Sequence, residues 1–204
     1  MNKHIGVSSF FNSLFAVSLL TLVVSLSSAH AETATKYWNL VFGMSQPLIL
    51  KGGNIEVNYL TEKWVFEYSH GWSLDLNASP DEKALTDTER TQGLSIFVPY
   101  STGGGIGYRF TPEFNLRVEF KQHKFQATNS TKQTIKYTTQ DLGIGAYYFY
   151  QPFKQHNFLV VPSIRYWPTI NTSLDNDIAV FENGEVHNAH DFGLFGNVSL
   201  GWQF

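Results

Sequence analysis

The sequence contains no cysteine among its 204 residues. This absence excludes disulfides, thiolate catalysis, cysteine-ligated metals and a lipid-anchored N-terminal cysteine. Charge is also scarce, because Asp, Glu, Lys and Arg make up 15% of the chain, against roughly 25% in soluble globular proteins. The 14 basic and 17 acidic residues nearly balance. Without a basic excess, we expect no nucleic-acid partner.

Long apolar runs are missing except near the N-terminus. There, Lys3 precedes an apolar run at 14–26, and small residues follow at Ala29-His30-Ala31. This order predicts a cleaved export signal over residues 1–31 and a mature domain over 32–204. The alternative, a transmembrane helix, would need roughly 20 apolar residues. Because no later segment is long enough, the mature chain could enter a membrane only as a closed β-barrel.

The mature sequence has the period-two pattern of β-strands and no sustained helical periodicity. In the last segment, for example, Leu194, Val198 and Trp202 share one face, while Asn197 and Ser199 lie on the other. Eight such segments are predicted, at 37–50, 53–60, 64–76, 94–110, 114–126, 136–150, 157–168 and 190–204. The first is the least regular, because Pro47 lies inside it.

The connections between these segments alternate in length. Short turns are expected at 61–63, 111–113 and 151–156, and longer polar loops at 77–93, 127–134 and 169–189. Short turns at one rim and long loops at the other are typical of outer-membrane barrels. We therefore predict an all-β fold, an eight-stranded antiparallel transmembrane β-barrel with an up-and-down meander and both termini on the periplasmic side.

Alternation alone leaves open whether the apolar face points into a soluble barrel or outward into lipid. The polar face combines Gly, Ser and Asn with a few charges, which suits a narrow interior better than a solvated exterior. Aromatic residues also gather near the segment ends, as in the two interfacial belts of membrane barrels, although aromatics favour strands in general. One belt would comprise Trp38, Trp64, Phe110, Phe114, Tyr150, Phe158, Trp202 and Phe204, and the other Trp72, Tyr100, Tyr166 and Phe192.

The C-terminal segment 198–204, Val-Ser-Leu-Gly-Trp-Gln-Phe, resembles the assembly signal of Gram-negative outer-membrane proteins, with Trp202 and Phe204 as its aromatic positions. Together with the export signal, the mature chain resembles the small OmpA/OmpX-type eight-stranded barrels. This resemblance implies a location in the cell outer membrane, contact with its lipid and lipopolysaccharide, and recognition of the last strand by the barrel assembly machinery. We also expect a monomer.

Nine charged residues are predicted to point into the barrel, and an eight-stranded interior is just wide enough for side chains to fill. Since unpaired buried charges are costly, we expect them to pair and close the lumen; the alternative is that they line a hydrated lumen. In a hairpin around 111–113, glycines 103, 105 and 107 would lie opposite long ionic side chains. The predicted lumen network comprises Glu56, Glu67, Arg109, Arg117, Glu119, Lys121, Asp141, Arg165 and Asp191.

A lipid-modifying hydrolase would need a nucleophile, a base and an acid close together. The candidates are Ser69, His70 and Asp75, but alternation directs His70 to lipid and both Ser69 and Ser73 inward, unless a bulge at Gly71 re-aims the later residues. Outer-membrane lipid A deacylases carry a His-x-Ser-Asn pattern, and the segment 187–190, His-Asn-Ala-His, lacks its serine.

Metal and cofactor sites have little support in the sequence. His187 and His190 lie near Glu185 and Asp191, yet no helix signal accompanies their spacing. The glycines at 103–105 lack the Gly-Lys-Ser/Thr ending of a phosphate loop. We therefore expect neither cofactor nor metal, and a protein without catalysis that serves envelope integrity or surface contact through loops 77–93 and 169–189. A lipid A or phospholipid hydrolase and a narrow transporter of a small apolar ligand are the alternatives.

Overall fold

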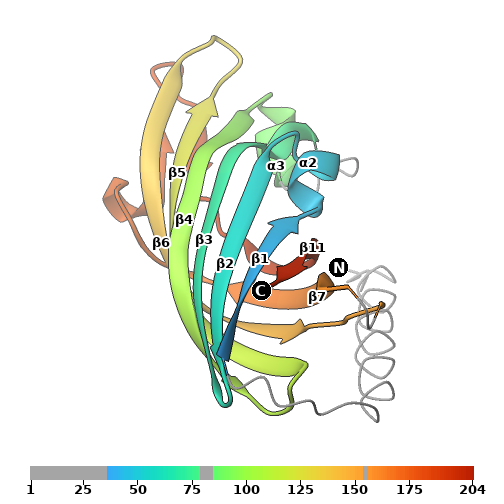
Figure 1. Cartoon of the computed structure of the whole chain (residues 1–204). Coiled ribbons are helices and arrows are strands. Elements are labelled where there is room, and N and C mark those ends of the chain that lie inside the picture. Colours follow the sequence, from blue (N-terminus) through green and yellow to red (C-terminus); the bar gives the residue numbers. More distant parts are fainter. Residues whose placement is uncertain (1–35, 79–84, 154–155) are drawn as a thin grey trace, which may run out of the picture. The chain divides into compact units, whose positions relative to one another are not determined.

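The computed structural model describes residues 36–78, 85–153 and 156–204; the predicted export signal lies outside these ranges. The wall of the fold is built from long antiparallel strands (Figure 1). These are β1 (Lys36–Gly43), β2 (Gly53–Thr61), β3 (Trp64–Asp75), β4 (Ser95–Arg109), β5 (Phe114–Thr128), β6 (Thr134–Tyr148), β7 (Phe158–Trp167) and β11 (Gly193–Gln203).

The strands form one closed sheet. Each strand pairs with its neighbour in sequence, β6 pairs with β7, β7 with β11, and β11 with β1. The backbone closes at the chain end, where the Trp38 amide donates to the Phe204 carbonyl at 2.8 Å. The prediction of an eight-stranded, antiparallel, up-and-down barrel is therefore confirmed. A closed barrel of this kind leaves no strand edge unpaired.

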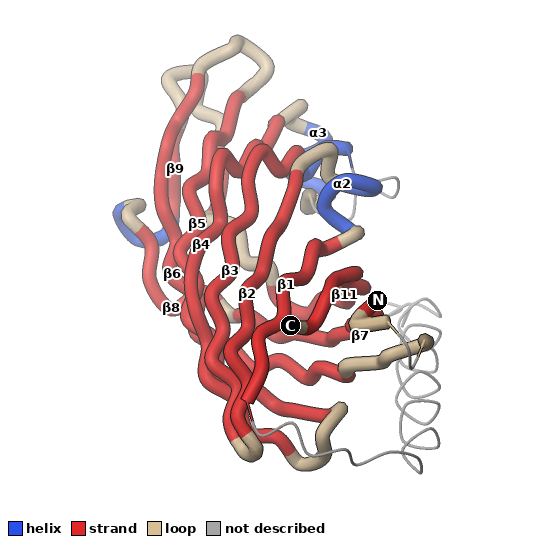
Figure 2. Tube along the Cα trace, viewed as in Figure 1, coloured by secondary structure: helices blue, strands red, loops and turns tan. Residues whose placement is uncertain are grey.

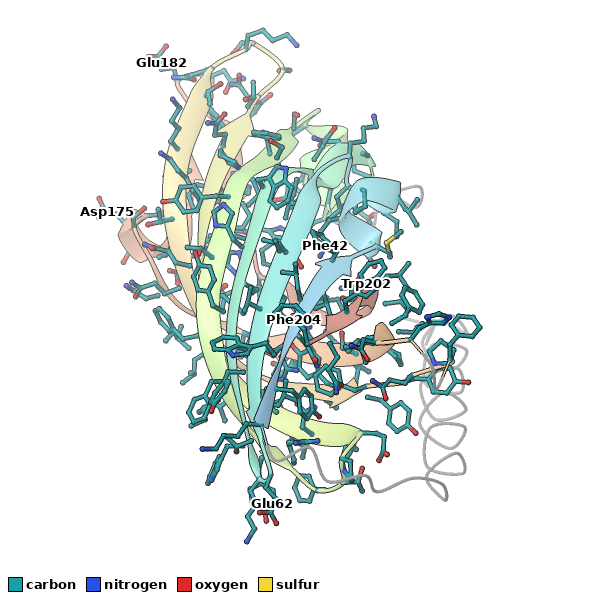
Figure 3. All side chains as sticks on the ribbon, viewed as in Figure 1. Phe42, Glu62, Asp175, Glu182, Trp202 and Phe204 are labelled. Carbon is teal, nitrogen blue, oxygen red and sulfur yellow. The ribbon has the colours of Figure 1, made fainter. Side chains whose placement is uncertain are left out.

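The hairpin register between β4 and β5 is also as predicted. Gly103, Gly105 and Gly107 pair with Lys121, Glu119 and Arg117, respectively. Glu62, in the short β2–β3 turn, and Glu182, in a long loop, mark opposite ends of the barrel (Figure 3). The barrel therefore has a short-turn rim, where β1 begins and β11 ends, and a long-loop rim.

The first predicted strand was too long. β1 ends at Gly43 and is followed by the short helix α2 (Ser45–Ile49). Pro47 lies in the first turn of α2, where a proline is tolerated because that N–H would have no intrahelical partner. The other helices are α3 (Asp87–Thr91), η1 (Leu76–Ala78) and η2 (Asp175–Asp177). In the described ranges, no helix has the length and apolar character needed to cross a membrane.

The last long loop is more ordered than predicted. Beyond Pro168 it contains β8 (Thr169–Thr172), which pairs with β6, and a hairpin of β9 (Ile178–Val180) and β10 (Val186–Asn188). Figure 2 shows β8 as a strand tube next to β6. Pro168 separates β7 from β8 because it lacks the backbone donor that a continuous ladder requires.

The outer surface is apolar and has aromatic rims. Near the short-turn rim, Trp38 packs against Tyr59 with ring centroids 4.9 Å apart, and Phe158 packs against Trp202 at 5.3 Å. Trp72 and Tyr166 are exposed nearer the other rim. Phe192, predicted in that belt, instead packs inward against His123 at 4.5 Å. An apolar outer face around an interior that contains buried charged residues is typical of an outer-membrane barrel, whereas a soluble barrel has a polar outer face.

The interior is filled in three layers. An apolar layer near the short-turn rim comprises Val41, Leu60, Val65, Tyr147, Phe149, Leu159 and Val161. Above it lies a charged layer described below. An apolar cap closes the long-loop end and comprises Leu74, Leu76, Leu85, Leu94, Ile96, Val98, Phe125, Ala127, Tyr137 and Phe181. The sequence pattern indicated the charged layer but neither apolar layer.

Candidate functional site: the charged layer and the loop cap

Glycines on both neighbours of β5 provide the space for the charged layer. A Cβ atom added at Gly107 would lie 2.6 Å from Arg117 Cγ, and one at Gly105 would lie 3.0 Å from Glu119 Cγ. On the other side, Gly145 and Gly143 pair with Arg117 and Glu119. Because these positions carry no side chain, the long side chains of β5 can lie across a narrow barrel.

Three acidic and three basic side chains form the charged layer: Glu56, Glu67, Glu119, Arg117, Lys121 and Arg165. Arg117 Nη1 donates to Glu56 at 2.8 Å and to Glu67 at 3.1 Å. Lys121 donates to Glu67, and Arg165 donates to Glu56 at 3.1 Å. All six side chains are buried, and their equal numbers of opposite charges leave no net charge in the layer. Removing one member would therefore leave an uncompensated buried charge.

Glu119 is held by two aromatic donors. Trp167 Nε1 donates to this carboxylate at 2.6 Å, and the Tyr147 hydroxyl also donates to it. The Arg117 guanidinium lies 3.6 Å from the Tyr147 ring centroid, and the Arg165 guanidinium lies 4.7 Å from it. Tyr147 therefore joins the acidic and basic members of the layer through its hydroxyl and its ring face.

The other three residues predicted for the lumen lie elsewhere. Arg109 is near the short-turn rim, where it donates to the Tyr37 hydroxyl at 2.7 Å. Asp141 lies beside His123, 3.1 Å from its Nε2, and accepts a hydrogen bond from Thr169. Asp191 is exposed, because β11 begins only at Gly193 and the preceding residues leave the alternating pattern.

The lumen network predicted from the sequence did not include its neutral partners, although alternation directed Ser69 inward. Asn58 and Asn115 accept hydrogen bonds from Arg117 at 2.9 and 2.8 Å, and Ser69 accepts from Lys121 at 2.6 Å. The period-two pattern places each on an inward face, so alternation could have identified them. The pairing of Trp167 and Tyr147 with Glu119 had no comparable signal, because it depends on distances across the barrel.

The structure does not bring the hydrolase candidates together. Ser69 is buried and bonded to Lys121, whereas His70 lies on the outer face and stacks near Trp72 and Tyr100. Asp75 accepts hydrogen bonds from Asn77. The Ser69–Lys121 contact also lacks the access that a nucleophile needs, because Lys121 is paired with Glu67 and both Ser69 and Lys121 are buried.

The backbone irregularity in β3 lies at Ser73, and Gly71 keeps regular pairing with Asn54 and Ser101. Ser73 has a φ of 55° and is exposed, so it does not point inward as strict alternation predicted. Beyond it, Leu74 is buried in the apolar cap. The irregularity therefore directs Leu74 into the cap and leaves Ser73 outside.

The cap contains a second buried polar network. His187 Nδ1 lies 2.8 Å from Glu89 Oε1, and its Nε2 lies 2.8 Å from the Tyr137 hydroxyl. Glu89 also accepts hydrogen bonds from Thr86, whose side chain caps α3 in return. We call Glu89, His187 and Tyr137 the loop latch, because they join α3, β10 and β6. Glu89 and His187 are 98 positions apart, and no sequence pattern links them.

The loop latch keeps its acidic member ionised over most of the pH range. Burial raises the pKa of Glu89, but hydrogen bonds from His187 and Thr86 outweigh it and lower the pKa to about 2. Because the folded-state pKa is depressed, Glu89 stabilises the cap above its unfolded pKa, and this contribution is lost only as the pH falls toward 2.

His190 should make the stability of the cap depend on pH in a range above that of Glu89. Burial lowers its pKa to about 4, from 6.5 in an exposed histidine. As the pH falls, His190 takes up a proton near pH 6.5 in the unfolded chain but only near pH 4 in the folded cap. The free energy of unfolding should therefore decrease by about 3 kcal/mol between pH 6.5 and pH 4. We expect faster hydrogen exchange of cap amides at pH 4.5 than at pH 7.5, after correction for intrinsic rates.

His190→Phe is the matched variant for this prediction. The ring of His190 lies among Phe125 and Phe192, at 5.6 and 5.3 Å between centroids, so phenylalanine keeps apolar packing and removes the titration. Groups that contribute to the charge around His190 include Glu89, His187, Asp191 and His123, all kept in the variant. An equal pH response in the variant would contradict the assignment.

Among the described residues, no group of three or more His, Cys, Asp or Glu side chains could hold a metal ion. His187 is bonded to Tyr137 and Glu89, whereas His190 lies among aromatic rings. These two histidines are therefore engaged by neighbouring side chains in the cap.

Several solved structures are similar to this chain. The attachment invasion locus protein Ail of Yersinia pestis is 13% identical, with a TM-score of 0.41, over 83% of this chain and 95% of Ail. A major outer membrane protein of Thermus thermophilus is 10% identical, with a TM-score of 0.43, over 83% and 99%. Neisserial surface protein A is 13% identical, with a TM-score of 0.42, over 82% and 92%. No family model and no curated protein matches the sequence.

Proposed function

We propose that this outer-membrane barrel is a non-catalytic integral protein with a closed interior, acting in surface contact through its long loops. The observation that carries the proposal is the filled interior, in which the charged layer lies between two apolar layers. A water-filled channel would need a continuous polar path, whereas apolar layers exclude water and ions. The long-loop rim then remains as the surface for recognition.

The proposal includes the surroundings of the barrel. Its apolar outer face would contact outer-membrane lipid, and the strand ends above that face would meet lipopolysaccharide. The terminal strand with Trp202 and Phe204 would be recognised by the assembly machinery, and the folded protein would be a monomer. The support is the outward exposure of these two aromatics, 53% and 67%, on the last strand and at the chain end.

A conductance measurement tests the closed interior. Purified mature protein in planar lipid bilayers should give negligible single-channel current, because the side chains of the three layers obstruct the axis. A general porin inserted in the same bilayer serves as the positive control. Large, stable currents from folded protein would overturn the proposal.

Lipid analysis tests the absence of catalysis. Lipid A and phospholipids from cells with wild-type protein and with His70→Ala should have identical mass spectra, since His70 lies on the outer face away from Ser69. A modified lipid that depends on His70 would instead support the hydrolase.

A further inference from the structure

The β9–β10 hairpin presents an aliphatic outer face at the long-loop end of the barrel. Ile178, Val180 and Val186 are exposed by 41%, 64% and 41%. Val180 and Val186 are direct cross-strand partners, so their side chains share one face. We call these three residues the hairpin patch. Exposed aliphatic residues that adjoin one another on a loop mark an interaction surface more often than isolated ones do.

The hairpin is held in a defined position from beneath. His187 of β10 belongs to the buried loop latch, and Phe181 packs into the apolar cap. Ser130, from the β5–β6 turn, donates to Glu185 at 3.0 Å, and the Glu182 amide donates to Gln133. A surface whose backbone is already ordered has less conformational entropy to lose on binding.

The charge around the patch is acidic. Residues 168–192 contain five acidic residues and neither lysine nor arginine. Asp175 and Glu182 extend from the same side of the barrel, one near each end of the hairpin (Figure 3). The β5–β6 turn, whose Ser130 and Gln133 contact the hairpin loop, contains one basic residue, Lys132.

This charge pattern selects among possible occupants. Hydrocarbon would not accept the exposed carboxylates of Asp175, Asp177 and Glu182, and anionic lipopolysaccharide would be repelled by them. A second copy of the chain would oppose two acidic loops. A cationic polypeptide with an apolar face fits both the aliphatic centre and the acidic surroundings.

We propose that the hairpin patch binds a cationic amphipathic polypeptide outside the cell. This proposal rests on the surface-contact role and names the class of partner. Val180 and Val186 would supply apolar contact, while Asp175, Asp177 and Glu182 would attract the basic side chains and accelerate association.

The binding test uses folded mature protein in phosphatidylcholine nanodiscs and a labelled amphipathic helical peptide of leucine and lysine. Nanodiscs without protein give the lipid background. We expect binding at least about tenfold tighter than for a leucine–glutamate peptide or a serine–lysine peptide, because these lack the cationic or the apolar component. Equal binding of either comparison peptide would overturn the proposal.

Two variants separate the contributions of the patch and the charges. Val180→Ser combined with Val186→Ser should weaken binding about tenfold. Asp175→Asn combined with Asp177→Asn and Glu182→Gln should weaken binding and reduce its salt dependence. Glu62→Gln, at an exposed position of the β2–β3 turn at the opposite end of the barrel, is the control and should bind as the wild type does. Anomalous gel mobility before boiling verifies that each variant is folded.

Other occupants give distinguishable results. Self-association detected by sedimentation and abolished by the valine variant would assign the patch to a second copy and overturn the proposal. Lipopolysaccharide binding lost in the same variant would also overturn it. If the peptide does not bind and the barrel does not conduct, only the proposed class of partner is rejected. If the barrel gives large currents in planar bilayers, the closed interior of the proposed function is rejected.

Discussion

Replacing Arg117 with methionine should destabilise the barrel by about 3–5 kcal/mol, because removing one member of a buried ion-pair network leaves uncompensated charge. Arg117 contacts both Glu56 and Glu67. Without it, three carboxylates would face two cations in a layer enclosed by apolar residues. Urea unfolding in lipid vesicles, followed by tryptophan fluorescence and by gel mobility before boiling, measures the change.

A second substitution distinguishes loss of charge balance from loss of packing. Arg117→Met combined with Glu56→Gln restores equal numbers of positive and negative groups, and Glu67 keeps Lys121. The double variant should therefore be more stable than Arg117→Met alone by about 1 kcal/mol or more. Lys136→Ala, at an exposed position of β6, is the surface control. If the double variant were the less stable of the two, packing of the guanidinium would dominate over charge balance.

Period-two alternation predicted the charged layer because each member lies on a regular strand. Once a strand is assigned, the inward direction of Glu67 or Arg117 follows from its position, and pairing follows from the cost of burying charge. The same reasoning misplaced Asp191, which precedes the first residue of β11, and Ser73, where the backbone adopts a positive φ. Alternation therefore predicts orientation within a ladder and fails where the ladder ends or the backbone turns.

The loop cap could not be predicted in the same way. Glu89 and His187 come from different loops, and their contact depends on how both loops fold over Tyr137. Leu85 and Phe181 become buried for the same reason, because their partners lie far away in sequence. A polar composition predicted loops at these positions, but the buried residues inside them have no periodic signal.

The closed interior and the ordered loops are physically connected. β4, β5 and β6 each contain 15 residues, against 8 in β1, so one side of the wall extends further at the long-loop end. The inward residues of that extension, including Phe125 and Tyr137, form the base on which the loops pack. The interior is therefore filled up to the long-loop end, and the loops are held against the barrel there.

Gly103→Ala should have the other large effect and prevent normal closure of the wall between β4 and β5. A Cβ atom at this position would lie 2.0 Å from the Phe120 carbonyl oxygen and 2.8 Å from Lys121 Cα. Both atoms belong to the backbone of the paired strand, so a change of rotamer cannot relieve the overlap. We expect at least about 3 kcal/mol of destabilisation, at the upper end for overpacked cores, and a large loss of the folded gel band after refolding into vesicles.

Gly196→Ala is the matched control, because it makes the same chemical change in another barrel strand. A Cβ atom there would lie 3.8 Å from the Ser163 carbonyl oxygen, at ordinary contact distance. This variant should refold as the wild type does and show similar urea resistance. If Gly103→Ala were as stable as the wild type, β4 and β5 could separate locally without loss of the barrel. The close approach of β5 to Gly103 would then not be required for closure of the wall.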